Sequence, residues 1–230
     1  MYRNRVGFPH RCISYKQPDS QKSFNLYECN DKMVKSVVLS WVRNWVIGQG
    51  LCPWAASVMA DNKLDITVIR QSYENEHIAD IHSSILRAAS NIVDPTTSTE
   101  TALVALPAVT DFNVFLELVA DVEELLEHKQ LDSDIQLATF HPDYQFEGTD
   151  STDVTNFTNR SPCALLHLLS VPQVTAVIDR VNGDTDFVWK NNMKRLKMLG
   201  LDKVKRMQVE ITNGALGNSV LPVEEDKSKF

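Results

Sequence analysis

Three short apolar segments separated by helical patterns constrain the fold of this chain more than any other feature. LDITVIR (64–70), TALVALP (101–107) and DIQLATF (134–140) have the composition and patterning of β-strands. Between them, apolar residues spaced three or four positions apart predict helices over 74–91 and after Asp111. Crossover connections of this length imply right-handed βαβ units. The sequence therefore predicts an α/β fold, with helices packed on a small parallel three- to four-stranded sheet in a single domain.

The two ends of the chain carry no such pattern. Residues 1–27 hold five Lys or Arg against one acid, Asp19, and we expect an unstructured leader over residues 1–30. That bias fits an organellar transit peptide, a disordered leader or an incorrectly assigned start. We expect the α/β domain over 31–212, with MQVEIT (207–212) as a candidate fourth strand, and a disordered tail over 213–230.

The first predicted helix leads into the motif LCPWA. Asn30 or Asp31 is a suitable N-cap, and apolar residues from Val34 to Trp45 form one helical stripe. Gly48 and Gly50 then end the helix, because glycine enters the left-handed region without a Cβ clash. Cys52 follows this glycine-bounded end directly.

Charge and cysteine content restrict the partners and the compartment. The 230 residues carry a net charge of -7, which opposes binding to nucleic acid or to an anionic membrane. The basic residues between 190 and 206 fit a solvated helix face. No apolar run approaches the ~20 residues of a membrane span. Four cysteines are too few for a disulfide scaffold, so we expect an intracellular location, cytoplasmic or in a plastid or mitochondrion.

Polar residues gather after the third predicted strand, in the stretch ATFHPDYQFEGTDSTDVTNFTNRSPCALLHLL. His141, Asp143 and Tyr144 follow the carboxyl end of that strand, where parallel sheets bind ligands. Ser161 and Pro162 predict a helix N-cap and first turn, whose free N–H groups favour an anion. Arg160 would add a bidentate partner for a carboxylate or phosphate. The alternative is a capped helix with Arg160 paired to a structural acid.

Cys52 is the candidate nucleophile or redox thiol. A thiolate needs a lowered pKa, which His141 or His167 would supply if the fold brings them to Cys52. A cysteine beside Trp54 is also typical of a small buried hydrophobic residue. Cys52, His141, Asp143 and His167 could instead bind zinc or iron, although no short ligand spacing supports a metal site.

The motifs LCPWA, ATFHPDYQFEGT and NFTNRSPCALLHLL, in this order, resemble the domain of unknown function 1415 family over roughly residues 35–205. The resemblance matches Cys52 and Pro53 to its LCPF-like motif and His141, Pro142, Gln145 and Phe146 to its FHPxxQF-like motif. It matches the stretch 159–162 and His167 to its NRSP-like motif and the histidine beyond. This chain departs from the pattern at Cys163-Ala164 and at Ser170-Val171, where the family tends to have Tyr-Pro and Arg-Glu. The resemblance implies that these polar residues form one unit, and it implies no substrate.

These observations lead to one hypothesis and two alternatives. We expect an enzyme that acts on a small anionic metabolite, and the sequence leaves both the cofactor and the oligomeric state open. The candidate catalytic residues are Cys52, His141 and His167, with His141 or His167 as general base. The candidate substrate-binding residues are Arg160, Ser161, Asn159, Tyr144 and Gln145. The alternatives are a non-catalytic binding or assembly module and a metal-binding protein.

Overall fold

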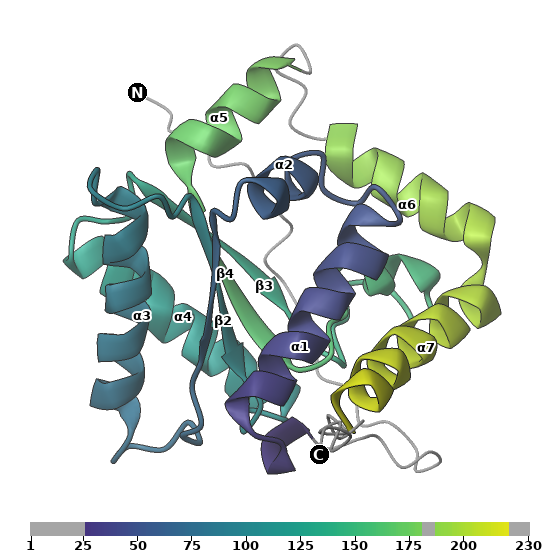
Figure 1. Cartoon of the computed structure of the whole chain (residues 1–230), viewed down its shortest axis with the longest axis horizontal. Helices are drawn as coiled ribbons and strands as arrows, with labels where there is room; N and C mark the ends of the chain where they lie inside the picture. Colours follow the sequence, from purple (N-terminus) through teal and green to yellow (C-terminus); the bar gives the residue numbers. More distant parts are fainter. Residues whose placement is uncertain (1–25, 181–186, 221–230) are drawn as a thin grey trace, which may run out of the picture.

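The computed structural model describes residues 26–180 and 187–220, which form a sheet between two layers of helices (Figure 1). The elements in chain order are η1 (Leu26–Glu28), α1 (Asp31–Trp41), the π-helix η2 (Val42–Ile47), α2 (Ala55–Ala60), β1 (Leu64–Val68), α3 (Ile78–Val93), β2 (Thr101–Leu106), α4 (Phe112–His128), β3 (Ile135–Phe140), η3 (Val154–Thr158), β4 (Ala164–Ser170), α5 (Val171–Arg180), α6 (Phe187–Leu199) and α7 (Leu201–Val220).

The sheet has four strands in the order β1-β2-β4-β3. β1 and β2 pair in parallel, whereas β4 pairs antiparallel with both β2 and β3. The α/β class and the three predicted strands are confirmed, but the prediction of a parallel sheet is wrong. β1, β2 and β3 run in one direction, and β4 enters between β2 and β3 from the opposite end.

β4 is the segment that the sequence assigned to a helix after Ser161 and Pro162. A short run of leucines fits a buried helix or a buried strand equally well, because its periodicity does not separate them. The central slot between β2 and β3 buries both faces of the strand, so a continuous apolar run is what that slot requires. The candidate fourth strand at 207–212 is also wrong, since it lies within α7.

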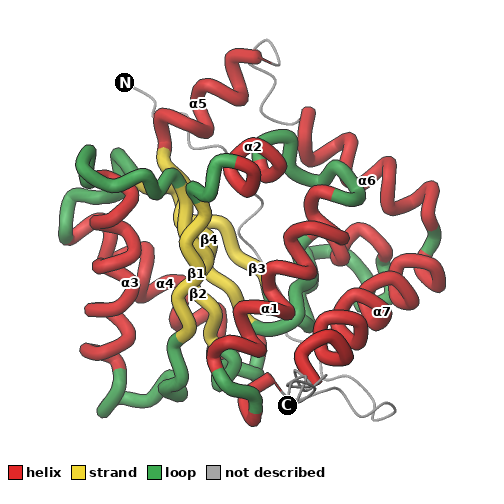
Figure 2. The backbone as a smooth tube through the Cα atoms, in the orientation of Figure 1, coloured by secondary structure: helices red, strands yellow, loops and turns green. Residues whose placement is uncertain are grey.

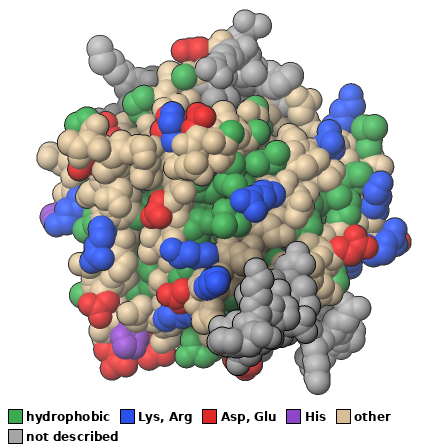
Figure 3. Space-filling model, in the orientation of Figure 1, with side chains coloured by type: hydrophobic (Ala, Val, Ile, Leu, Met, Phe, Trp, Pro, Cys, Tyr) green, Lys and Arg blue, Asp and Glu red, His purple; other side chains and the backbone are tan. Residues whose placement is uncertain are grey.

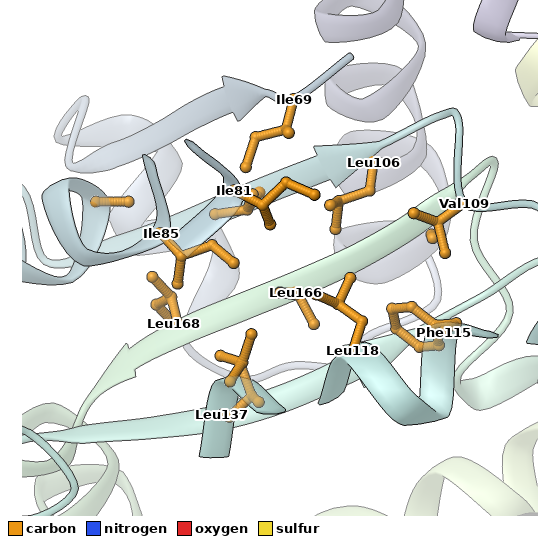
Figure 4. Close-up of a cluster of buried hydrophobic side chains, with 14 of the residues drawn as sticks. Ile69, Ile81, Ile85, Leu106, Val109, Phe115, Leu118, Leu137, Leu166 and Leu168 are labelled. Atoms are coloured by element: carbon orange, nitrogen blue, oxygen red, sulfur yellow. The ribbon is translucent and has the colours of Figure 1, made fainter. Parts of the chain in front are cut away.

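One face of the sheet is covered by α3 and α4. Figure 4 shows Ile81 and Ile85 of α3 and Phe115 and Leu118 of α4 lying against the side chains of the strands. All four side chains are completely buried. Asp111 begins α4 as predicted, because its carboxylate accepts hydrogen bonds from the N–H groups of Asn113 and Val114.

The other face is covered by α1, α2, α6 and α7, which lie on the opposite side of the strands in Figure 2. Asn30 is the N-cap of α1 as predicted, with its side-chain oxygen accepting from the N–H of Met33. Val204 and Ile211 of α7 belong to the same buried cluster as Val34 and Trp41 of α1. Packing against α1 therefore sets the helical state of the segment that was expected to be a strand.

The two glycines after the first helix act differently. Gly50 has a φ of +62°, the left-handed conformation that glycine adopts without strain. Gly48 keeps a right-handed φ of -60°, but a Cβ there would lie 2.4 Å from the backbone oxygen of Asn44. The π-helix η2 causes this close approach, and the turn that follows brings Leu51 and Cys52 back toward the sheet.

Both predicted chain ends differ from the structure where it describes them. The leader was expected to extend to residue 30, yet Leu26–Glu28 form a short 3-10 helix. The tail was expected from residue 213, yet α7 continues to Val220. Residues 1–25 and 221–230 lie outside the described residues. Within the described part of the chain, no helix combines the length and apolar character that crossing a bilayer requires.

Candidate functional site

The predicted site residues separate into two groups, and the first group lies in the loop between β3 and β4. His141 is fully buried, and its ring lies 5.1 Å from Phe112 and 5.2 Å from Phe115. Its Nδ1 accepts a hydrogen bond of 3.1 Å from the N–H of Asp143. Burial lowers the pKa of His141 to about 4, and the backbone of Val109 and the charge of Asp111 oppose this only in part. His141 is therefore a neutral core residue on the α4 side of the sheet.

Arg160 is buried and donates hydrogen bonds to the backbone of this loop. Its Nε donates to the carbonyl of Tyr144 at 3.2 Å, and its Nη2 donates to the carbonyl of Ser151 at 3.0 Å. Its guanidinium also lies over the Phe157 ring, 4.3 Å from the ring centroid. Only 6% of Arg160 is exposed, so its donors serve the loop backbone.

The other predicted substrate-binding residues of this loop make similar internal contacts. The hydroxyl of Ser161 donates to the carbonyl of Cys163 at 2.6 Å, and no helix begins there. The side-chain amide of Gln145 donates to the carbonyl of Thr149 at 2.6 Å. Tyr144 is buried, with its ring against Phe112 and Phe146. The helix terminus that motivated the predicted anion pocket is thus absent from this part of the structure.

Two tryptophans of the first helical segment fasten the loop to the rest of the fold. Trp41 donates its indole N–H to the carbonyl of Arg160 at 3.2 Å, and Trp45 donates its own to the carbonyl of Phe157 at 3.3 Å. Both indole groups are buried. Both indole N–H groups therefore bond to the backbone of this loop within the chain.

The second group of predicted residues, Cys52, Asn159 and His167, lines one cavity of about 400 Å³. The cavity lies on the sheet face opposite α3 and α4, between the strands and the segment 51–59. Its floor consists of the strand side chains Leu64, Thr101, Leu103, Gln136, Ala138, Phe140, His167 and Leu169. Thr101, Gln136 and Leu169 lie level with one another in the sheet register. The cavity therefore sits near the amino ends of β1, β2 and β3, away from the carboxyl ends that the parallel-sheet rule indicated.

The walls of this cavity are mainly apolar. They come from the first helical segment, from α2 and its preceding turn, and from α5 and α6. Their apolar members include Trp41, Val46, Leu51, Trp54, Val58, Met59, Val174, Ile178, Val188 and Trp189. None of the described residues that line the cavity is Lys, Arg, Asp or Glu. Strand alternation could have identified the floor, whereas the contribution of α6 has no local signal in the sequence.

Cys52 lies in this wall with a protonated thiol. Burial raises the pKa of Cys52 above its ordinary value, and the backbone N–H groups of Trp54 and Ala55 oppose this only in part. No histidine, lysine or arginine is among the causes of its shift. The environment is the opposite of the electropositive surroundings that activate a cysteine.

Asn159 and His167 reach the same cavity from two elements. Asn159 follows η3, and its amide donates to the carbonyl of Thr139 at 3.1 Å while its side-chain oxygen accepts from Thr158. His167 projects from β4, with its Nε2 2.8 Å from the hydroxyl oxygen of Thr101. Burial lowers the pKa of His167 to about 4, so the ring is neutral at pH 7.

The four residues considered as a metal site do not converge. His141 packs on the α4 side of the sheet, whereas Cys52 and His167 line the cavity on the other side. Among residues 26–180 and 187–220, no group of three or more His, Cys, Asp or Glu is placed to hold a metal ion.

Comparison with known families identifies the same family that the sequence motifs resemble. Residues 33–206 match the family described as protein of unknown function (DUF1415). The chain belongs to this family. No curated protein and no solved structure matches the chain. In this DUF1415 member, the motif residues therefore have to be interpreted from their own contacts: Arg160 and His141 in the loop, Cys52 and His167 at the cavity.

Proposed function

We propose that the protein binds a small, uncharged and mainly apolar molecule in the cavity between the sheet and α2. One observation carries this proposal: a cavity of about 400 Å³ has apolar walls, a few polar groups and no charged side chain among its described lining residues. Small-molecule sites typically occupy about 300–1,000 Å³ and have this composition. Burial of apolar ligand surface here would supply the binding free energy, at roughly 25 cal/mol per Å².

The anionic metabolite expected from the sequence has less support. Arg160 donates to two backbone carbonyls inside the loop, and it does not line the cavity. An anion moved into this cavity would lose its hydration without gaining a charged partner, which is costly. A neutral ligand avoids that cost.

A pair of adjacent alanines on α2 provides a sharp test. Ala55 lines the cavity and is partly buried, whereas Ala56 is exposed. Ala55→Trp should fill part of the cavity, and Ala56→Trp should add the same side chain on the outside. A panel of neutral aromatic and aliphatic compounds is screened by the shift in melting temperature, and hits are measured by tryptophan fluorescence. We expect hits that bind the native protein and Ala56→Trp but bind Ala55→Trp at least tenfold more weakly.

Two outcomes would overturn this proposal. One is a panel in which no compound stabilises the native protein. The other is a set of hits that bind Ala55→Trp and Ala56→Trp equally well, since such compounds would bind elsewhere.

Catalysis at the same cavity is the second candidate, because Cys52, Asn159 and His167 all line it. A Cys52 nucleophile would need an apparent pKa below the ordinary ~8.5 and a dependence of that pKa on His167. The rate of alkylation of Cys52 against pH, in the native protein and in His167→Phe, decides between the two functions. A low apparent pKa that rises in the variant would favour the enzyme, and slow alkylation throughout would favour binding without thiol chemistry.

A further inference from the structure

His167 is the residue that can give the cavity a chemical preference. It lies in the middle of β4, with Leu103 and Ala138 as its neighbours on the adjoining strands. Its ring lies 6.3 Å from that of Phe140, which also lines the cavity. On this mainly apolar floor, a ring that can donate or accept a hydrogen bond is positioned to select the ligand.

The contacts of Thr101 fix which nitrogen of His167 carries the proton. The Thr101 hydroxyl lies 2.7 Å from the carbonyl of Leu168 and 2.8 Å from His167 Nε2. A carbonyl only accepts, so the single hydroxyl proton is donated to Leu168. The hydroxyl oxygen must then accept from His167, which places the ring proton on Nε2.

The other ring nitrogen is consequently a lone-pair acceptor. The neutral ring has one proton, and with that proton on Nε2 the Nδ1 atom has none. Nδ1 is not among the buried unpaired atoms, and it has no hydrogen-bond partner within residues 26–180 and 187–220. Within the described structure, Nδ1 is therefore reachable and unsatisfied.

The wall of the cavity also includes an unsatisfied donor. The indole N–H of Trp189 is buried and has no hydrogen-bond partner among the described residues. Trp189 lines the cavity from α6. Because this N–H is itself enclosed, recognition of the ligand depends on His167 Nδ1, and no ligand contact is assigned to Trp189.

We propose that the ligand is a neutral alcohol, phenol or amide whose O–H or N–H donates to His167 Nδ1, while its apolar body fills the cavity. This inference rests on the proposed function, since it assumes that the cavity holds a ligand. A buried hydrogen bond of this kind contributes about 0.5–1.5 kcal/mol. It should therefore favour a ligand that can donate over its methyl ether by roughly 3- to 10-fold in affinity.

The tautomer can be tested without any ligand. The ring-nitrogen chemical shifts of His167, measured by NMR on the native protein at neutral pH, should show a protonated Nε2 and an unprotonated Nδ1. Thr101→Val removes the hydroxyl that fixes this arrangement while keeping the size of the side chain, and it should shift the ring toward a mixture of tautomers. A native ring protonated on Nδ1 would overturn the inference.

The preference is tested with 2-naphthol and 2-methoxynaphthalene, which share an apolar body and differ in the donor. We expect 2-naphthol to bind the native protein more tightly and the preference to vanish in His167→Phe, with the affinity for 2-methoxynaphthalene retained. His128→Phe is the matched control, because His128 is exposed at the end of α4. It should keep the native preference.

The outcomes separate the two proposals. Equal affinities of the native protein for both probes would overturn the role of His167 and leave the cavity as a binding site. A preference for 2-naphthol that persists in His167→Phe would do the same. Failure of both probes to bind, together with an empty compound panel, would overturn the proposed function and this inference with it.

Discussion

The two faces of the sheet are both covered by helices, but only one of them is completely filled with side chains. On the α3 and α4 face, completely buried side chains fill the space between strands and helices (Figure 4). On the other face, the helices leave a cavity of about 400 Å³ over the strands. Each face holds a histidine whose pKa burial lowers to about 4. His141 is enclosed by aromatic rings, whereas His167 lines the cavity. Burial and a shifted pKa therefore do not identify a site unless an atom remains free to meet a ligand.

The largest expected contrast between the faces is in the cost of removing the same side chain. Leu118 of α4 is completely buried in the filled face, and Leu169 of β4 lines the cavity. Leu118→Ala should destabilise the protein by about 3–4 kcal/mol, because it creates a new cavity in a packed core. Leu169→Ala should cost about 1–2 kcal/mol, because space already adjoins it. Urea denaturation of both variants measures the difference, and equal losses would show that the second face is packed like the first.

The next prediction concerns Arg160, in the loop between β3 and β4. Arg160→Met should destabilise the protein by about 2–3 kcal/mol, because the carbonyls of Tyr144 and Ser151 lose their buried donors. Arg87→Met on the exposed side of α3 is the control and should change stability by less than about 0.5 kcal/mol. Phosphate should raise the melting temperature of native protein and Arg160→Met equally, if at all. A phosphate effect that only Arg160→Met abolishes would restore the anion site predicted from the sequence.

The pH dependence of stability should reveal the buried histidine of the filled face. The pKa of His141 is about 4 in the fold and about 6.5 in the unfolded chain. Between these two pKa values, His141 is protonated in the unfolded chain and neutral in the folded protein. The free energy of unfolding therefore falls as the pH drops from 6.5 toward 4. At pH 5 the loss from His141 alone should be about 2 kcal/mol relative to neutral pH. His141→Phe should make the urea-derived stability less dependent on pH between 5 and 7, whereas His128→Phe should leave the slope unchanged.

The smallest expected effect on stability comes from a substitution at Cys52 in the cavity wall. Cys52→Ala should cost less than about 1.5 kcal/mol, because the thiol is small and borders open space. Alkylation of native Cys52 at neutral pH should be slow, since burial raises the pKa of its thiol. Unfolding in urea should accelerate it strongly, and peptide mass spectrometry measures both rates. Fast alkylation of the native protein would make the cavity a reactive site and not only a binding site.

The basic side chains of α6 test the prediction made from the charge pattern. Lys and Arg side chains gather along the edge of the molecule where α6 lies (Figure 3). Lys190, Lys194, Arg195 and Lys197 are all exposed there. The sequence indicated a solvated helix face for this region, and the structure agrees, because these side chains are exposed to solvent.

Local rules in the sequence determined the elements that depend on few neighbours. The strands β1, β2 and β3, and the caps at Asn30 and Asp111, follow from periodicity and hydrogen-bonding chemistry within a few residues. The family followed from the motifs themselves. The predicted site residues Cys52, Asn159 and His167 lie at one cavity. The helix after Ser161, on which the predicted anion pocket depended, is replaced by strand β4.

Tertiary structure alone decided the rest. Whether ALLHLLS forms a strand depends on the open slot between β2 and β3, and whether 207–212 is helical depends on packing against α1. Arg160 and His167 differ in role because one reaches two carbonyls of its own loop and the other reaches a hydroxyl on a neighbouring strand. Such partners lie 9 to 66 positions away along the chain, beyond the range over which periodicity and capping carry information.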